Sequence, residues 1–265
     1  MTKPLVPWIG GKRKLASEII PLFPEHTCYV EPFCGAAALF FMKDRSKSEV
    51  LNDINLDLIN LYRIVTHHAQ ELYAQFRWCL SSRDQFQRLL KTNPESLTDI
   101  QRAARFLYLQ KLAFGGKVDG QSWGTATTAR PKLNILTLER DLEDCHQRLE
   151  GVHLENKDWA KLIAQYDRPH TLFYCDPPYW QTEGYGVKFD FDNYERLAEL
   201  ARTIKGSMII SINGHPDIKE LFKGFPMKSV NYKYTVSGGG KASKAVELII
   251  ANSESIIPKR SRRKR

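Results

Sequence analysis

Residues 171–180 constrain the fold of this chain more than any other segment. They read Thr-Leu-Phe-Tyr-Cys-Asp-Pro-Pro-Tyr-Trp, so a short apolar run ends at a carboxylate, two prolines and two aromatic residues. A run of this kind is typical of a strand buried in a parallel sheet. Because proline fixes φ and has no N–H, a rigid loop begins where the strand stops. Ligands of open α/β sheets bind beyond such strand ends, so the segment predicts an α/β fold with a site here.

The residues that follow this strand are Asp176, Pro177, Pro178 and Tyr179. The Asp176 carboxylate and the proline carbonyls can only accept hydrogen bonds. They therefore suit a group with two N–H donors, such as the exocyclic amine of a nucleobase, and Tyr179 and Trp180 offer faces on which a base can stack. A strand end with Asp176 as a cap and prolines that stiffen a turn is the simpler alternative. The complete tetrad after an apolar strand favours the catalytic interpretation.

Segment 27–41 predicts a strand, a turn of small residues and a helix. Such a turn aims the backbone donors of a helix N-terminus at a bound ligand, as in nucleotide sites. A second strand is predicted over 50–54. It contains Asp53, which follows Gly35 by roughly 20 residues, the spacing of a carboxylate that binds ribose hydroxyls. Asp53 also fits an alternative role as the cap of a helix predicted to begin near Leu56.

Near the N-terminus, Trp8 precedes a glycine pair and Lys12, and a helix is predicted over 16–23. Paired glycines let the backbone approach a ligand closely, and the lysine can meet a carboxylate or a phosphate there. A glycine turn that leads into a helix with solvated lysines has the same pattern. The segment predicts a ligand contact only in combination with the other motifs.

The chain between the two strand motifs has helical periodicity over 56–112 and again over 136–149. Segment 114–130 between them is rich in glycine and polar residues. It predicts a flexible loop or hairpin that could touch nucleic acid through Lys117, Gln121, Trp123 and Arg130. An ordinary connecting loop is the alternative.

Further along, a strand is predicted from Val152 and an acidic loop follows it. Asp158 in this loop could accept a hydrogen bond from the adenine amine of a cofactor or could cap the helix that begins at Trp159. A helix over 194–204, a strand over 207–212 and a hairpin complete the chain. The hairpin strands are predicted over 231–235 and 245–252, around the glycine-rich segment 237–241.

Length and composition favour one large domain, or a domain with an insertion. The chain has 265 residues, of which 42% are hydrophobic, and no apolar run approaches the roughly 20 residues of a membrane span. We therefore expect a soluble, cytoplasmic protein. The five cysteines have neither disulfide nor zinc-site spacing. The net charge is +9, and six basic residues lie within 258–265. This tail fits either a non-specific nucleic-acid contact or a solvated end.

Four motifs together resemble the Dam family, the class alpha DNA adenine-N6 methyltransferases. They read Trp-Ile-Gly-Gly-Lys at 8–12, Glu-Pro-Phe-Cys-Gly at 31–35, Asn-Asp-Ile-Asn-Leu-Asp at 52–57 and Asp-Pro-Pro-Tyr at 176–179. The resemblance extends to about residue 252. It implies a Rossmann-like fold, S-adenosylmethionine as methyl donor without a metal, and adenine in double-stranded DNA as acceptor. It also implies a catalytic domain of residues 1–55 and 150–257, with a mainly helical target-recognition insertion at 56–149.

The resemblance also implies roles for individual residues. The flipped adenine would rest against Tyr179 while Asp176 and the Pro177 carbonyl hold its amine, with Pro178 as the fourth member of the catalytic tetrad. The residues expected to contact the cofactor are Phe33, Gly35, Asp53, Asp158 and Asp176. Trp8 and Lys12 are expected either to contact the cofactor as well or to help order the catalytic loop.

Two positions depart from the family pattern. Ala37 replaces the second glycine of the cofactor loop, which is expected to tighten the pocket. Loop 114–130 lacks the Arg-Tyr-Asn type of pattern with which Dam enzymes read GATC. The recognition site is therefore GATC or another short site, or it is relaxed as in some prophage-borne relatives.

Other classes of protein share parts of this pattern. Enzymes that methylate cytosine N4 or RNA adenine use the same tetrad, because it recognises an amine on a ring. A nicotinamide-dependent dehydrogenase would explain the small-residue turn and Asp53, although it has no use for the tetrad. A DNA-binding protein without catalysis would explain the basic tail.

Overall fold

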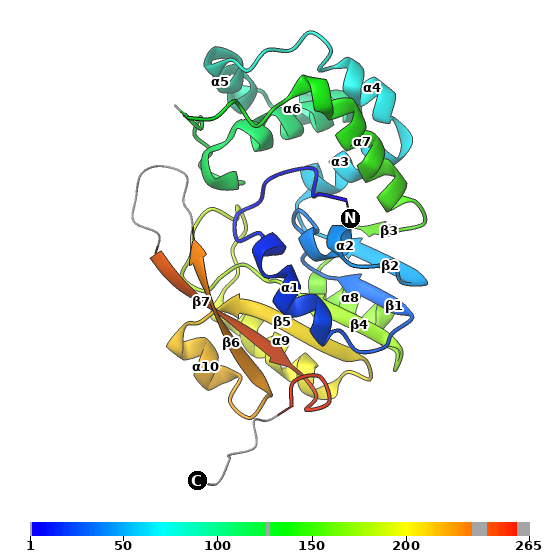
Figure 1. Ribbon diagram of the computed structural model, residues 1–265, viewed down its shortest axis with the longest axis vertical. Helices are drawn as coiled ribbons and strands as arrows, with labels where there is room; N and C mark the ends of the chain where they lie inside the picture. Colours follow the sequence, from blue (N-terminus) through cyan, green and yellow to red (C-terminus); the bar gives the residue numbers. More distant parts are fainter. Residues whose placement is uncertain (1, 126–127, 235–242, 259–265) are drawn as a thin grey trace.

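The computed structural model describes residues 2–125, 128–234 and 243–258 (Figure 1). Two predictions fall outside these ranges. They are the hairpin turn at the glycine-rich segment 237–241 and the nucleic-acid contact of the basic residues 259–265. No helix within the described ranges is long and apolar enough to cross a membrane.

A seven-stranded sheet runs through the molecule in the order β3-β2-β1-β4-β5-β7-β6. The first five strands in this order are parallel, and β7 is antiparallel to both β5 and β6. The strands are β1 Cys28–Glu31, β2 Ser48–Asn52, β3 His153–Glu155, β4 Thr171–Cys175, β5 Ser207–Asn213, β6 Met227–Tyr234 and β7 Ser243–Ala251. The predicted Rossmann-like α/β class is confirmed.

The strand order reverses between β1 and β4, which lie side by side in the centre of the sheet. From β1 the chain moves outward to β2 and β3, and it then returns to the other side of β1 as β4. Loops that leave the carboxyl ends of β1 and β4 therefore diverge and leave a crevice between them. All five residues of β4 are buried, as its continuous apolar run predicts.

Two hydrophobic cores cover the two faces of the sheet. Successive strand residues alternate between them: Tyr29 and Leu172 belong to one core, while Val30 and Phe173 belong to the other. Helices α8 Trp159–Tyr166, α9 Phe191–Thr203 and α10 Pro216–Leu221 cover the second face. The first face meets α1 Ala16–Ile19, α2 Ala38–Met42 and the helices inserted between β2 and β3.

The inserted helices gather at one end of the molecule, at the top of Figure 1. They are α3 Leu56–His67, α4 Ala69–Ala74, α5 Arg83–Lys91, α6 Asp99–Leu112 and α7 Ile135–Leu149. Arg148 in the last turn of α7 ties them to the sheet, because its guanidinium lies 2.6 Å and 2.9 Å from the two carboxylate oxygens of Glu49 on β2. The boundaries of a target-recognition insertion at 56–149 remain a prediction that these helices fit.

Several predicted elements differ in extent. The helix expected over 16–23 ends at Ile19 and continues as a 3-10 turn, Ile20–Leu22, because Pro21 cannot donate to a helical hydrogen bond. The strand expected over 50–54 ends at Asn52. The hairpin strand expected over 231–235 begins earlier, at Met227. The six-residue helix α10 was not predicted at all.

Candidate active site

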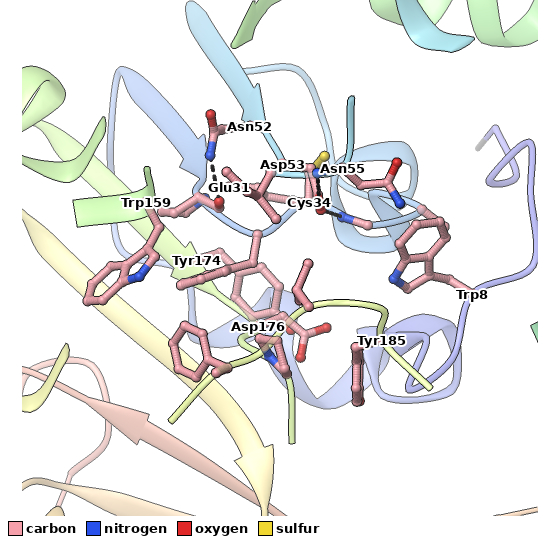
Figure 2. Close-up of a pocket in the computed structure, with 18 of the residues that line it drawn as sticks. Trp8, Glu31, Cys34, Asn52, Asp53, Asn55, Trp159, Tyr174, Asp176 and Tyr185 are labelled. Atoms are coloured by element: carbon pink, nitrogen blue, oxygen red, sulfur yellow. Dashed lines mark hydrogen bonds between the residues drawn. The ribbon is translucent and has the colours of Figure 1, made fainter. Parts of the chain in front are cut away.

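A cavity of about 400 Å³ opens at the strand reversal, between the carboxyl ends of β1 and β4 (Figure 2). Its volume lies within the range usual for small-molecule sites. Every residue for which a cofactor contact was predicted lines this cavity: Trp8, Lys12, Phe33, Gly35, Asp53, Asp158 and Asp176. Residues that are widely separated in sequence therefore share one site. The role of each toward a ligand remains a prediction.

Gly35 lets Trp8 cover one side of the cavity. The backbone of Gly35 has φ +47°, and a Cβ added there would lie 2.6 Å from the indole nitrogen of Trp8. A larger residue would therefore displace the tryptophan ring. The next turn residue with positive φ is Ala37, at φ 51°. Ala37 is fully buried and is not among the residues that line the cavity, so any effect of its methyl group on the pocket would be indirect.

The inserted helices hold the N-terminal segment that carries Trp8. The amide of Gln110 on α6 donates to the carbonyl of Pro7 at 2.8 Å and to that of Gly116 at 2.9 Å. The Gly116 carbonyl also accepts from the backbone N–H of Ile9 at 3.0 Å. Gln110 is completely buried, so these hydrogen bonds are shielded from water. One wall of the cavity thus depends on the insertion.

Asp53 connects the turns that follow β1 and β2. Its two carboxylate oxygens accept from the backbone N–H of Gly35 and of Asn55, each at 2.9 Å. Burial raises the pKa of Asp53, and these backbone donors oppose that increase. The alternative role of Asp53 as a helix cap is wrong: Asn55 caps α3 by accepting from Leu58 N–H at 3.0 Å. A side chain one residue before the helix is better placed for this bond.

Asp158 has the predicted role of a helix cap, and its contact with a cofactor amine remains a prediction. It caps α8 by accepting from the backbone N–H of Lys161 at 3.0 Å, and it lines the cavity. Beside it, the Phe33 ring lies 5.5 Å from that of Trp159 and 5.6 Å from that of Phe189. Trp159 and Phe189 complete an aromatic wall that the sequence motifs did not reveal, since single aromatic residues carry no spacing signal.

Asp176 lies at the end of β4, on the other side of the cavity, and forms an ion pair with Lys12. The Lys12 side chain is only 2% exposed, whereas that of Asp176 is 23% exposed. Burial raises the pKa of Asp176 to about 6, against the opposing effect of Lys12. Burial alone would lower the pKa of Lys12, but Asp176 and Glu247 raise it well above its ordinary value. Lys12 therefore stays cationic beside a carboxylate whose pKa, about 6, is higher than usual for an aspartate.

Tyr179 turns its ring toward the same ammonium group. The Lys12 nitrogen lies 4.7 Å from the centre of the Tyr179 ring, within cation–π range. The centres of the Tyr179 and Tyr185 rings are 6.1 Å apart. The Tyr179 hydroxyl donates to Glu247 at 2.7 Å. Glu247 and Tyr185 were missed by the sequence analysis, because neither belongs to a motif.

Trp180 is not among the residues that line the cavity. Its ring packs against Phe191, with centroids 5.1 Å apart, and its indole N–H donates to Asp217 at 2.9 Å. The Pro178 carbonyl is also engaged, since it accepts from the Tyr194 hydroxyl. Of the four residues in the tetrad, Asp176 and Pro178 line the cavity.

Segment 114–130 starts as a hairpin. Phe114 N–H donates to the Ser122 carbonyl at 2.8 Å, and Gly124 N–H to the Leu112 carbonyl at 2.9 Å. Among the predicted nucleic-acid contacts, Lys117 and Arg130 are exposed. Gln121 donates to Gln110 at 2.9 Å. The Trp123 ring packs on Phe86, with centroids 5.6 Å apart, so it supports the loop from inside.

Comparison with known proteins identifies the family of the chain. A family model described as "D12 class N6 adenine-specific DNA methyltransferase" matches residues 8–236. The chain belongs to this family. It is therefore an adenine-specific DNA methyltransferase, and the dehydrogenase and non-catalytic alternatives are set aside.

Individual relatives agree with the family over most of their length. The chain is 27% identical to the type II methyltransferase M1.LlaDCHI of Lactococcus lactis subsp. cremoris, with 94% of this chain and 95% of the relative covered. It is also 27% identical to the DNA adenine methylase of Haemophilus influenzae, covering 94% and 93%. The same identity to the DNA adenine methylase of Escherichia coli K12 extends over 92% of both chains.

Proposed function

We propose that this protein transfers the methyl group of S-adenosylmethionine to the N6 amine of adenine in double-stranded DNA, after the adenine has been flipped out of the helix. The observation that carries the proposal is the position of Asp176. Its partly exposed carboxylate lies at the border between the nucleotide-type cavity and the Asp-Pro-Pro-Tyr loop. A carboxylate there can face a cofactor and a base at the same time.

The residues around the cavity fit S-adenosylmethionine. The Phe33 and Trp159 rings form an apolar wall suited to an adenine ring, and Asp158 lies next to them as an acceptor for its amine. Asp53 offers a carboxylate to ribose hydroxyls. When bound, the cofactor supplies a methyl group on a positively charged sulfur, and Asp176 provides negative charge on that side of the cavity.

The protein's own groups then act by position and charge. Asp176 and the Pro177 carbonyl each accept one amine hydrogen and aim the nitrogen lone pair into the cavity. The assignment of Pro177 follows the resemblance to the family, and the Pro178 carbonyl accepts a hydrogen bond from Tyr194. The target base stacks on Tyr179, since its amine cannot reach the cavity from within the duplex.

Substitution of Asp53 tests the cofactor assignment. Asp53→Ala should weaken S-adenosylmethionine binding about 10- to 100-fold, because charge-assisted hydrogen bonds contribute about 1.5–3 kcal/mol. Isothermal titration gives the dissociation constant, and thermal unfolding reports any loosening of the Gly35 and Asn55 turns. Glu220→Ala is a suitable control, since Glu220 is an exposed residue on α10. An unchanged dissociation constant for Asp53→Ala would rule out the ribose role.

Two exposed residues of the hairpin loop test DNA contact. The double variant Lys117→Ala/Arg130→Ala should bind DNA more weakly, and the slope of log K against log salt should become shallower by about 2, or roughly 0.9 per lost phosphate contact. Arg168→Ala/Lys205→Ala is the matched control. Both residues are exposed, and they lie before the amino ends of β4 and β5, whereas the cavity lies at the carboxyl ends of the strands. Equal slopes in the two double variants would contradict loop contact.

The sequence context of methylation tests the recognition site. Unmethylated DNA is incubated with the enzyme and S-adenosylmethionine, and modified adenines are mapped by long-read sequencing. We expect a short or relaxed site rather than strict GATC, because loop 114–130 lacks the Arg-Tyr-Asn type of pattern. Methylation confined to GATC would contradict this expectation.

A further inference from the structure

Glu247 is an acid in the middle of strand β7, directly before an apolar run. It lies on β7, opposite Asn213 of β5, and the residues that follow it, Leu248, Ile249 and Ile250, are buried hydrophobic side chains. The side chain of Glu247 has 0% exposure. A buried carboxylate is costly unless charged or hydrogen-bonded partners compensate, so its partners reveal what it does.

Both partners of Glu247 belong to the proposed transfer site. One oxygen accepts from the Tyr179 hydroxyl at 2.7 Å. The other lies 3.6 Å from the Lys12 nitrogen and makes no hydrogen bond within the described part of the chain. Lys12 in turn pairs with Asp176 and lies against the Tyr179 ring. Glu247 therefore contacts both Tyr179, through a hydrogen bond, and Lys12, through an ion pair.

We infer that Glu247 is a positioning residue for methyl transfer: it fixes the Tyr179 ring through the hydroxyl and holds the Lys12 ammonium in place between two carboxylates. The inference rests on the proposed roles of Asp176 and Tyr179 and extends them to a residue outside every sequence motif. A ring fixed at its hydroxyl end keeps its face in one orientation, and a misplacement of about 1 Å can lower a rate about 100-fold.

The direction in which Glu247 shifts the pKa of Asp176 can be tested. The charged and titratable groups around Asp176 are Lys12, Glu247, Tyr174, Cys175 and Glu31. The nearby Ser211 hydroxyl, which lies 2.6 Å from that of Tyr174, lowers the pKa of Asp176. The negative charge of Glu247 raises the pKa of Asp176, whereas Lys12 lowers it. Removal of the Glu247 charge alone should therefore lower the pKa of Asp176.

Two conservative variants separate the two contacts. Glu247→Gln removes the charge and keeps an acceptor for Tyr179, while Tyr179→Phe removes the hydroxyl and keeps the ring. Each should lower kcat/KM for duplex DNA about 10- to 100-fold. Glu247→Gln should also move the acidic limb of the pH–rate profile to lower pH, and Tyr179→Phe should leave that limb in place. Glu220→Gln on exposed α10 should match the wild type in both measurements.

The double variant tests whether the two residues act as a unit. If they share one contact, Glu247→Gln/Tyr179→Phe should be no more than about threefold slower than the slower single variant. Fully additive losses, or a Glu247→Gln enzyme with wild-type rate and an unmoved acidic limb, would overturn the inference. Asp176→Ala is measured in parallel: an active Asp176→Ala enzyme defeats the proposed function itself, whereas an inactive one confines the failure to Glu247.

Discussion

Asp176→Ala should lower turnover at saturating DNA and cofactor by about three orders of magnitude. The variant loses the acceptor that holds one amine hydrogen, and it leaves the buried Lys12 ammonium without its closest partner. Loss of a single preorganised electrostatic contact in an active site costs about 100- to 1,000-fold, and the loss of amine orientation adds to this. Single-turnover methyl transfer to duplex DNA measures the effect without interference from product release.

The pH dependence of the wild-type enzyme belongs to the same prediction. The pKa of Asp176 is raised to about 6, so the fraction of enzyme with an ionised acceptor falls as pH decreases through that value. Single-turnover rates should therefore decline on the acidic side of about pH 6. Asp176→Asn keeps the shape of the side chain and cannot titrate. An Asp176→Ala or Asp176→Asn enzyme that retains the wild-type rate would contradict the assignment.

Lys12→Met should have the largest effect on stability. The substitution leaves the buried carboxylate of Glu247 and the partly exposed carboxylate of Asp176 without the cation between them. Removal of one member of a buried ion pair costs about 3–5 kcal/mol, which corresponds to a decrease of roughly 10 °C in Tm for a domain of this size. Thermal unfolding followed by circular dichroism measures this decrease.

Lys12→Met should also change the titration of the site. Because Lys12 lowers the pKa of Asp176, its removal should raise that pKa and move the acidic limb of the rate profile to higher pH, opposite to the shift expected for Glu247→Gln. Lys14→Met is the matched control, since Lys14 is exposed two residues further along. Equal Tm values for the two lysine variants would show that the buried ion pair contributes little.

The parts of the site that could be predicted from the sequence are those carried by contiguous motifs. The apolar run before Asp176 predicted a strand buried in a parallel sheet, and β4 is such a strand. Gly35 and Asp53 were placed together by their spacing, and a hydrogen bond of 2.9 Å joins them. In both cases the geometry depends on local chain chemistry, which short sequence patterns record.

The remaining features depend on pairings across the fold. Glu247 reaches Tyr179 because β7 pairs with β5 in one particular register, and a shift of one residue would turn its side chain to the other face. Gln110 supports the Trp8 segment by donating to the carbonyl of Pro7, which is distant from it in sequence, and to that of Gly116, which lies just beyond the end of α6. Trp123 was predicted to contact DNA, and its packing on Phe86 was not foreseen. Periodicity alone does not distinguish these outcomes.

Identification of the methylated nucleoside tests the central claim most directly. Unmodified duplex DNA is incubated with the enzyme and radiolabelled S-adenosylmethionine, digested to nucleosides and separated, with Asp176→Ala in parallel. Label in N6-methyladenine, present with the wild type and absent with the variant, is the predicted result. Label in N4-methylcytosine, or no labelled DNA from an enzyme that still binds the cofactor, would contradict the account.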